Sequence, residues 1–496
     1  MNNQKKIIES VMVVDIGTSS IKTSLFDTFA KNIPKMSVKI PHKIINKIDG
    51  TSEQDPEHLR LLVERSIDLI LEKSIDIVEK IIAVSFDSMA STILGIDHRG
   101  EAITPIFTYA DTRTYKQVEK IKIELNESVL HDHTGVMQHT SYVPPRIMWL
   151  KENNPHLVKK IYKYLDFSTY LYSKWFKSKE YFASYSISSW SGLLNRHELD
   201  WDSQLLDYLD LDLENLPQLK SYENYQINLN KTYSKRWPKL LESKFFLSVG
   251  DGASANIGSG CVNENKIALT IGSTGAMRVI MKDNPKNIPE GLWSYKLGKD
   301  RSLLGGSFSE GGNLIKWANN NLNLPKDRLL DSYLKNLTPG QHGLSVLPFF
   351  SGERSIGWSN NSLGIISGIK LSNSSVDILQ AILESVAYRF YLVYGLLKNY
   401  TNNAQIFVSG EAIKNSSWWT QTISDVLNVP LNISGNTEET SKGSAILCLT
   451  TLGLFNETDN LDLNKYNTFL PDENRHNVYQ DLLKNHVDLY KKNISN

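Results

Sequence analysis

Two stretches of this chain carry the residue types needed to move a phosphoryl group onto an alcohol. Asp251 stands between two glycines, so a ligand could approach its backbone and its carboxylate closely. Farther along, Gly272-Ser273-Thr274-Gly275 predicts a tight turn between strands at 267–271 and 276–281, with backbone N–H groups directed at an anion. An acid that takes a proton from a hydroxyl, beside donors that hold phosphoryl oxygens, is what phosphoryl transfer to an alcohol requires.

Each pattern is also typical of an ordinary turn. A second copy of the strand-turn-strand unit argues for function, because an apolar run at 11–16 leads into Gly17-Thr18-Ser19-Ser20 and then a second strand. This duplication predicts two related domains, each presenting a small-residue turn to a shared cleft. Only the first copy carries an acid before its turn. That residue, Asp15, suits Mg²⁺ held through one carboxylate, water and nucleotide phosphates.

Five segments, spread in order over nearly the whole chain, resemble the FGGY family of carbohydrate kinases: DIGTSSIK, the Gly-Asp-Gly acid, TIGSTGAMR, GERSIGW and SGEAIKNSSWW. Members of that family phosphorylate sugars or polyols from ATP. The resemblance implies an α/β fold with two actin-like (ribonuclease H-like) ATPase domains flanking a central cleft. It implies Asp251 as the catalytic base, Asp15 as the Mg²⁺ ligand, and as phosphate contacts Gly17, Thr18, Ser19, Gly272, Ser273 and Thr274.

The resemblance also assigns residues to the nucleotide. Gly312 ends a glycine-rich loop before a helix that contains Trp317, where backbone amides at the helix N-terminus could meet the nucleotide. Gly410 and Asn415 belong to the loop that lies against the adenosine in the family. Glu411 replaces one of the two adjacent glycines usually found there, which adds bulk and negative charge.

Four residues are candidate contacts to the acceptor. Met89 follows the strand predicted at 81–85, where the resembling gluconokinases have Met-His and this chain has Met-Ala. Asp111 and Arg113 are similar to the family's Trp-x-Asp-x-Arg loop, although the same pair could be an exposed ion pair of little weight. His139 is placed as in gluconokinases, although a lone histidine is more often structural. In the segment LPFFSGERSIGW, the adjacent Glu and Arg could likewise simply pair with each other.

The bulk properties exclude several classes of protein. With 496 residues the chain is long enough for two domains, which we place at 1–246 and 247–496, with a connecting region of little core at 220–244. Lysine plus arginine and aspartate plus glutamate both number 54, so nothing argues for a nucleic-acid or membrane partner. Two cysteines and a polar N-terminus without a secretory signal predict a cytoplasmic protein. We expect a small-molecule sugar or sugar acid as partner and leave a homodimer open.

The leading hypothesis is therefore a kinase that uses ATP and Mg²⁺ to phosphorylate a sugar or sugar acid. The pattern favours gluconate, with xylulose or another polyol as the alternative. A second hypothesis is a weakly active or non-catalytic relative that senses nucleotide or sugar, motivated by departures from the family pattern at Ala90, Ser359, Leu363 and Glu411. An actin-like filament or chaperone ATPase is the least favoured, because it needs neither the Tyr109–Arg113 loop nor Asp251.

Overall fold

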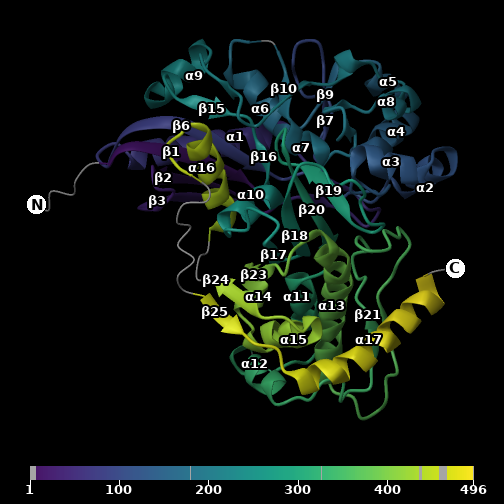
Figure 1. Cartoon of the computed structure of the whole chain (residues 1–496). Helices are drawn as coiled ribbons and strands as arrows, with labels where there is room; N and C mark the ends of the chain where they lie inside the picture. The colour runs from purple at the N-terminus through teal and green to yellow at the C-terminus, as the bar shows by residue number, and fades with distance from the viewer. Residues whose placement is uncertain (1–6, 179, 326, 435–437, 457–465, 495–496) are drawn as a thin grey trace, which may run out of the picture.

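The computed structural model describes residues 7–178, 180–325, 327–434, 438–456 and 466–494. Each half of the described chain is organised around one mixed sheet. In Figure 1 the first half, coloured purple to teal, forms the upper lobe, and much of the second half forms the lower lobe. None of the helices in these residues is both long enough and apolar enough to span a bilayer.

The first sheet has the strand order β14-β15-β6-β1-β2-β3, with β16 also pairing with β6. Its central strand, β1, is antiparallel to β2 and parallel to β6. Apolar side chains of β1 that are fully buried explain why this run forms a central strand. The strands are β1 (Ile7–Ile16), β2 (Ser20–Asp27), β3 (Asn32–Pro41), β6 (Val78–Ser88), β14 (Tyr225–Gln226), β15 (Lys244–Phe246) and β16 (Val249–Gly250).

The second sheet repeats this plan in the order β19-β20-β18-β17-β23-β24-β25. Its strand β17 is antiparallel to β18 and parallel to β23, as β1 is to β2 and β6. The two small-residue turns therefore occupy equivalent places, between β1 and β2 and between β17 and β18. The strands are β17 (Lys266–Ile271), β18 (Gly275–Lys282), β19 (Trp293–Lys296), β20 (Arg301–Phe308), β23 (Gln405–Ser409), β24 (Leu431–Ser434) and β25 (Tyr466–Phe469).

Helices cover both sheets. In the first half, α1 packs on β2 and β3, and in the second half α13 packs on β18 and β20. The helices of the first half are α1 (Pro56–Lys73), α2 (Tyr115–Glu124), α3 (Glu127–Thr134), α4 (Val143–Asn153), α5 (Pro155–Val158), α6 (Phe167–Trp175), α7 (Tyr185–Ser189), α8 (Ser203–Leu209) and α9 (Lys231–Arg236). Those of the second half are α10 (Asp251–Gly258), α11 (Gly312–Asn321), α12 (Asp327–Lys335), α13 (Ser375–Leu397), α14 (Glu411–Lys414), α15 (Ser417–Leu427), α16 (Glu439–Thr451) and α17 (Glu473–Ile494).

Short strands complete the described fold. Ser345–Leu347 (β21) pairs with Ile365–Ser367 (β22) in the second half. The other small sheets contain β4 (Ile45–Asn46), β5 (Ser52–Gln54), β7 (Leu94–Ile96), β8 (Ile106–Phe107), β9 (Lys163–Leu165), β10 (Phe182–Ser184), β11 (Leu194–Asn195), β12 (Asp200–Trp201) and β13 (Gln218–Lys220).

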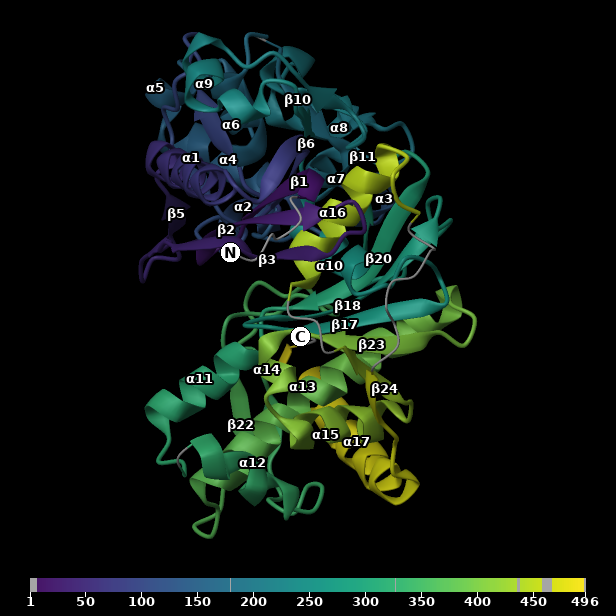
Figure 2. The same cartoon turned by 90° about the vertical axis from the view of Figure 1, so that its left-hand side faces the viewer.

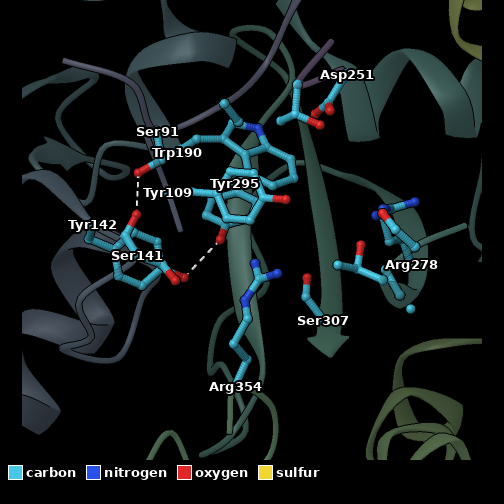
Figure 3. A pocket seen from close by; sticks show the side chains of 16 residues that line it. Ser91, Tyr109, Ser141, Tyr142, Trp190, Asp251, Arg278, Tyr295, Ser307 and Arg354 are labelled. Atoms are coloured by element: carbon cyan, nitrogen blue, oxygen red, sulfur yellow. Dashed lines mark hydrogen bonds between the residues drawn. The ribbon is translucent and has the colours of Figure 1, made fainter. Parts of the chain in front are cut away.

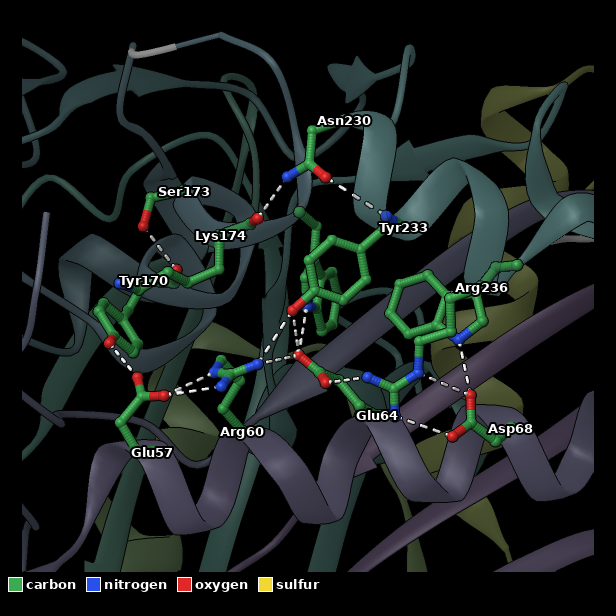
Figure 4. Close-up of polar contacts among 12 residues, drawn as sticks. Glu57, Arg60, Glu64, Asp68, Tyr170, Ser173, Lys174, Asn230, Tyr233 and Arg236 are labelled. Atoms are coloured by element: carbon green, nitrogen blue, oxygen red, sulfur yellow. Dashed lines mark hydrogen bonds and ion pairs between the residues drawn. The ribbon is translucent and has the colours of Figure 1, made fainter.

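The expectation that residues 220–244 have little core is wrong. Trp237 and Leu240 are fully buried. Figure 4 shows α9 docked on α1, where the Arg236 guanidinium pairs with the carboxylates of Glu64 and Asp68. The partners of this polar segment lie on a helix far away in sequence, so composition alone could not reveal its packing. The domain boundary at residue 246 stays a prediction, and β16, directly after it, pairs with β6 of the first sheet.

Helices α10 and α16 join the two halves. They pack against each other, and α16, from near the C-terminus, also packs on β1 and β6 of the first sheet (Figure 2). The contact is close because glycines face backbone: a Cβ on Gly258 would lie 1.7 Å from the carbonyl oxygen of Glu439, and one on Gly443 would lie 1.8 Å from that of Ser254. At the same crossing, the Ser444 hydroxyl donates to the Asp87 carboxylate over 2.9 Å.

We therefore expect Gly443→Ala to destabilise the protein by about 3 kcal/mol or more, because overpacking against rigid backbone forces the two helices apart. Gly395→Ala on α13 is the matched control, since a Cβ there meets nothing within 4 Å. That change should be neutral or stabilising by up to about 1 kcal/mol, because alanine is the better helix former. Urea unfolding measures the free energy of unfolding of both variants. Equal changes in the two variants would contradict the close crossing of α10 and α16.

Candidate active site

The candidate site is a cavity of about 210 Å³ between the two halves (Figure 3). Both halves supply its walls. The first half contributes Thr18, Ala90, Ser91, Tyr109, Ser141, Tyr142 and Trp190, and the second contributes Asp251, Ser273, Thr274, Gly275, Ala276, Arg278, Tyr295, Ser307 and Arg354.

Asp251 is the only carboxylate among the residues that line this cavity. It does not stand on a turn, as the sequence suggested, but is the first residue of helix α10, directly after β16. Its Oδ1 accepts a hydrogen bond of 2.7 Å from the backbone N–H of Gly252. Burial raises the pKa of Asp251, while the positive charges of Arg278 and Arg354 and this hydrogen bond lower it. The site therefore holds a shielded carboxylate that can accept a proton.

The two glycines beside Asp251 are explained by one aromatic side chain. A Cβ on Gly250 would lie 2.6 Å from Nε1 of Trp190, and one on Gly252 would lie 2.9 Å from its Cη2. The Trp190 ring in turn stacks on that of Tyr295 with 3.9 Å between ring centroids. The glycines thus let the Trp190 ring lie directly against the two residues that flank Asp251.

Both small-residue turns reach the same cavity. Thr18 from the β1–β2 turn lines it, and so do Ser273 and Thr274 from the β17–β18 turn. Gly17 and Ser19 flank Thr18 in a turn closed by a 3.1 Å hydrogen bond from the Gly17 N–H to the Ser20 carbonyl. The geometry thus brings both turns and Asp251 together. Their contacts to phosphate remain predictions.

Asp15 lies next to a second carboxylate that the sequence analysis did not select as a ligand. It pairs with Lys22 across the β1–β2 ladder and with Asp87 across the β1–β6 ladder. Burial raises the pKa of Asp15 to about 6 and raises that of Asp87 well above its ordinary range. Oδ1 of Asp87 is buried and lacks a hydrogen-bond partner.

These two carboxylates fit a hard cation. Mg²⁺ is bound through one or two carboxylates, with water and phosphate completing its shell, so it does not need a cage of protein ligands. No group of three metal-binding side chains occurs among the described residues. The orphaned oxygen of Asp87 beside Asp15 is consistent with this kind of site.

Two of the three predicted nucleotide residues, Gly312 and Gly410, border the second turn. The backbone N–H of Gly312 donates to the Gly272 carbonyl over 2.8 Å, so this amide is already used inside the fold. Gly410 has φ of +100°, and a Cβ there would lie 2.3 Å from the Ile271 carbonyl oxygen. Close packing around the turn thus accounts for both glycines, while Asn415 caps α14 and is exposed.

None of the four predicted acceptor contacts lines the cavity. Met89 belongs to the first-half core with 1% exposure, and its neighbours Ala90 and Ser91 line the cavity instead. His139 is buried, and its Nδ1 accepts from the backbone N–H of Ser141, a lining residue. Burial lowers the His139 pKa to about 3, so the ring is neutral.

Asp111 and Arg113 form a buried pair rather than an exposed one. Asp111 is fully buried and accepts from Arg113 over 2.6 Å and from the Ser52 N–H over 3.0 Å. Arg113 also pairs with Glu53. This network secures the loop whose Tyr109 lines the cavity.

Two arginines stand out among the lining residues. Neither Arg278 nor Arg354 forms an ion pair with a carboxylate among the described residues, and Nε of each is buried without a hydrogen-bond partner. In Figure 3 the Arg354 side chain extends towards Tyr295, and Arg278 lies to the right of the central strand. The alternative that Glu353 and Arg354 pair with each other does not hold, because Glu353 pairs with Arg389 instead.

Sequence reasoning missed part of this wall. Arg278 and Arg354 lie inside the family-like segments TIGSTGAMR and GERSIGW, but nothing in the sequence indicates which way their side chains point. Trp190 and Tyr295 are aromatic residues outside the five segments that resemble the family, so the sequence did not indicate that they line the cavity. Of the four departures that suggested a sensor, only Ala90 lines the cavity, and Leu363 is 74% exposed.

Comparison with known proteins places this geometry in context. The chain matches the N-terminal domain of the FGGY family of carbohydrate kinases over residues 10–258 and the C-terminal domain over 267–452. It is 26% identical over 460 residues to a gluconokinase of Bacillus subtilis (strain 168), covering 90% of this chain and 88% of that protein. A xylulose kinase of Lactococcus lactis is also 26% identical, over 390 residues, covering 76% and 75%.

Solved structures show the same fold. A gluconate kinase from Lactobacillus acidophilus superposes with a TM-score of 0.88 at 24% identity and covers 98% of both chains. A glycerol kinase from Plasmodium falciparum with ADP superposes with a TM-score of 0.83 at 20% identity, covering 98% of this chain and 99% of that one. The predicted α/β fold of two actin-like domains is confirmed.

We expect Asp251→Asn to lower turnover by about 100-fold to 10,000-fold, the usual contribution of a general base. The same change should raise the thermal unfolding midpoint at pH 7. Because the pKa of Asp251 is raised in the folded state, its charge costs stability above that pKa, and the cost disappears as the pH falls below the ordinary value.

Asp111→Asn is the matched control, since it also neutralises a buried aspartate. That change should lower the unfolding midpoint, because it breaks a buried ion pair. If both variants lowered the unfolding midpoint equally at pH 7, the raised pKa assigned to Asp251 would be wrong.

Proposed function

Because the chain belongs to the FGGY family of carbohydrate kinases, we propose that it transfers the γ-phosphoryl group of ATP to a hydroxyl of a sugar acid, most specifically gluconate. The family establishes the coarser activity: the chain is a carbohydrate kinase, a phosphotransferase with an alcohol group as acceptor. The choice of acceptor is the part that needs an argument from this cavity.

Two arginines that form no ion pair among the described residues carry the proposal. Arg278 and Arg354 bring two positive charges to a wall whose only carboxylate is Asp251. A partly buried guanidinium that lacks a paired anion is unfavourable, and carboxylates match its planar fork of donors. An acceptor that carries its own carboxylate would supply the missing anion, whereas a neutral polyol would leave at least one guanidinium unpaired.

Asp251 acts as the general base in this proposal. Its carboxylate accepts the proton of the acceptor hydroxyl as that oxygen bonds to the γ-phosphorus, and the bond from phosphorus to the β-phosphate bridging oxygen breaks to release ADP. Mg²⁺, when bound, neutralises charge on the phosphates. Asp15, through water, and Asp87 would hold it, and Gly17, Thr18, Ser19, Gly272, Ser273 and Thr274 would hold phosphates.

The remaining predicted residues are assigned to the adenosine or to the support of the cavity wall. We propose that Gly312, Gly410 and Asn415 border the adenosine. Met89, Asp111, Arg113 and His139 act on the acceptor by holding the residues that face it: Ala90, Ser91, Tyr109 and Ser141. We propose a cytoplasmic location, in keeping with two buried free cysteines, and the homodimer stays a prediction.

Xylulose or another neutral polyol is the second candidate. It is favoured by the ring platform of Trp190 and Tyr295 and the serine hydroxyls around it, which suit an uncharged sugar. The xylulose kinase of Lactococcus lactis is as similar in identity as the gluconokinase of Bacillus subtilis, although over a shorter stretch.

An ADP-release assay with gluconate, xylulose and glycerol as acceptors tests the proposal. We expect turnover with gluconate, and we expect Arg354→Leu to raise the KM for gluconate by about 10-fold to 100-fold, as for the loss of charged hydrogen bonds. The KM for ATP should not change.

Turnover with xylulose but not gluconate would reverse the choice of acceptor. A higher KM for ATP in Arg354→Leu would instead assign that arginine to the nucleotide phosphates.

A further inference from the structure

Arg354 is held by its backbone rather than by its side chain. Its carbonyl accepts from the N–H of Trp358 over 2.8 Å. The next residue, Ser355, is tied to strand β20, because its N–H donates to the Ser307 carbonyl over 2.9 Å and its Oγ accepts from the Ser307 N–H over 3.0 Å. The guanidinium projects into the cavity from a short segment, residues 353–358, which we call the Arg354 segment.

The residue before Arg354 is the main anchor of this segment. Glu353 is buried, and both carboxylate oxygens accept hydrogen bonds. Oε1 accepts from the Arg389 guanidinium of α13 and from the Gly357 N–H over 3.2 Å. Oε2 accepts from the Ser362 hydroxyl over 3.1 Å and from the Tyr490 hydroxyl over 2.9 Å.

Tyr490 brings the last described helix, α17, into this anchor. Its ring lies 6.0 Å from that of Phe349, and the Arg389 guanidinium lies over both rings, at 4.9 Å from Phe349 and 5.3 Å from Tyr490. The fit is tight, since a Cβ on Gly357 would lie 1.9 Å from the Tyr490 hydroxyl. A helix near the C-terminus thus braces the segment that presents Arg354.

We propose that Tyr490, acting through Glu353, is a positioning residue that sets the acceptor specificity of the kinase. This inference rests on the proposed function, in which Arg354 binds the carboxylate of the acceptor. The Arg354 guanidinium lies over the Tyr109 ring, with 5.8 Å from its Cζ to the ring centroid, but it forms no ion pair among the described residues. Its place therefore depends mainly on the segment beneath it. Binding groups need such support, because a displacement of about 1 Å can cost about 100-fold in rate.

The same network could serve stability alone, and the two roles give different kinetics. If Tyr490 positions Arg354, its loss should weaken binding of the carboxylate acceptor and leave ATP binding unchanged. Its effect should also vanish once Arg354 is removed, because the residue it positions is then absent. A purely structural tie would affect all substrates together and would persist without Arg354.

The test compares Tyr490→Phe with Tyr479→Phe, a control on the same helix whose buried hydroxyl contacts Glu384 instead. Both are made in the full chain, with and without Arg354→Leu, and Glu353→Gln serves as a second variant of the anchor. The KM values for gluconate and ATP and the unfolding midpoint are measured for each. We expect Tyr490→Phe to raise the gluconate KM about 3-fold to 10-fold, Glu353→Gln to raise it further, and Tyr479→Phe to leave it unchanged.

In the Arg354→Leu background, Tyr490→Phe should have no further effect on the gluconate KM. The positioning proposal is overturned if Tyr490→Phe matches Tyr479→Phe, or if its effect is undiminished without Arg354, while gluconate turnover still depends on Arg354. If the wild-type protein phosphorylates only neutral polyols and Arg354→Leu leaves their KM unchanged, the proposed function fails, and the positioning proposal fails with it.

Discussion

The site depends on keeping one carboxylate charged in a buried cavity between two sheets. Burial alone would favour the protonated form of Asp251, and a protonated acid cannot serve as a base. The Gly252 N–H and the two nearby guanidinium groups oppose that tendency. Placing the acid at the first position of α10 also suits a negative charge, because a helix N-terminus carries partial positive charge.

The close packing around the site depends on glycines. Trp190 can lie against the backbone beside Asp251 only because both flanking residues are glycine, and α10 can lie against α16 only because Gly258 and Gly443 face backbone. Since α16 also rests on the first sheet, the helix that begins at the base contacts both halves of the chain. This placement would let movement of one half relative to the other change the surroundings of the base, as expected for a kinase that closes over its substrates.

The sequence predicted the parts of the site that are built from local pattern. The paired turns, with Thr18 in one and Ser273 and Thr274 in the other, could be predicted because strand, small residues and strand follow one another directly. The flanking glycines indicate Asp251, but they predict a turn where the structure has the start of a helix. Helix α10 begins at Asp251 because strand β16 ends at Gly250. The strand forms by pairing with β6, which is distant in sequence, so the local sequence does not predict it.

Residues whose role depends on side-chain direction could not be predicted. Asp111 and His139 have the right types, yet neither lines the cavity, because Asp111 pairs with Arg113 and His139 accepts from the backbone of Ser141. Arg354 lines the cavity, while its neighbour Glu353 forms an ion pair with Arg389 and accepts a hydrogen bond from Tyr490. Both partners are distant in sequence, so the sequence could not predict this arrangement.

The most direct test of the central claim is the affinity of the protein for two acceptors that differ only at one terminal carbon, a carboxylate in one and a hydroxymethyl group in the other. Titration calorimetry with gluconate and with glucitol, its neutral six-carbon counterpart, compares them in the same cavity. The arginine pair predicts that gluconate binds at least about tenfold more tightly, a difference of about 1.4 kcal/mol, and that Arg354→Leu removes most of this preference. Equal affinity for the two, or tighter binding of glucitol, would contradict the assignment of a carboxylate acceptor.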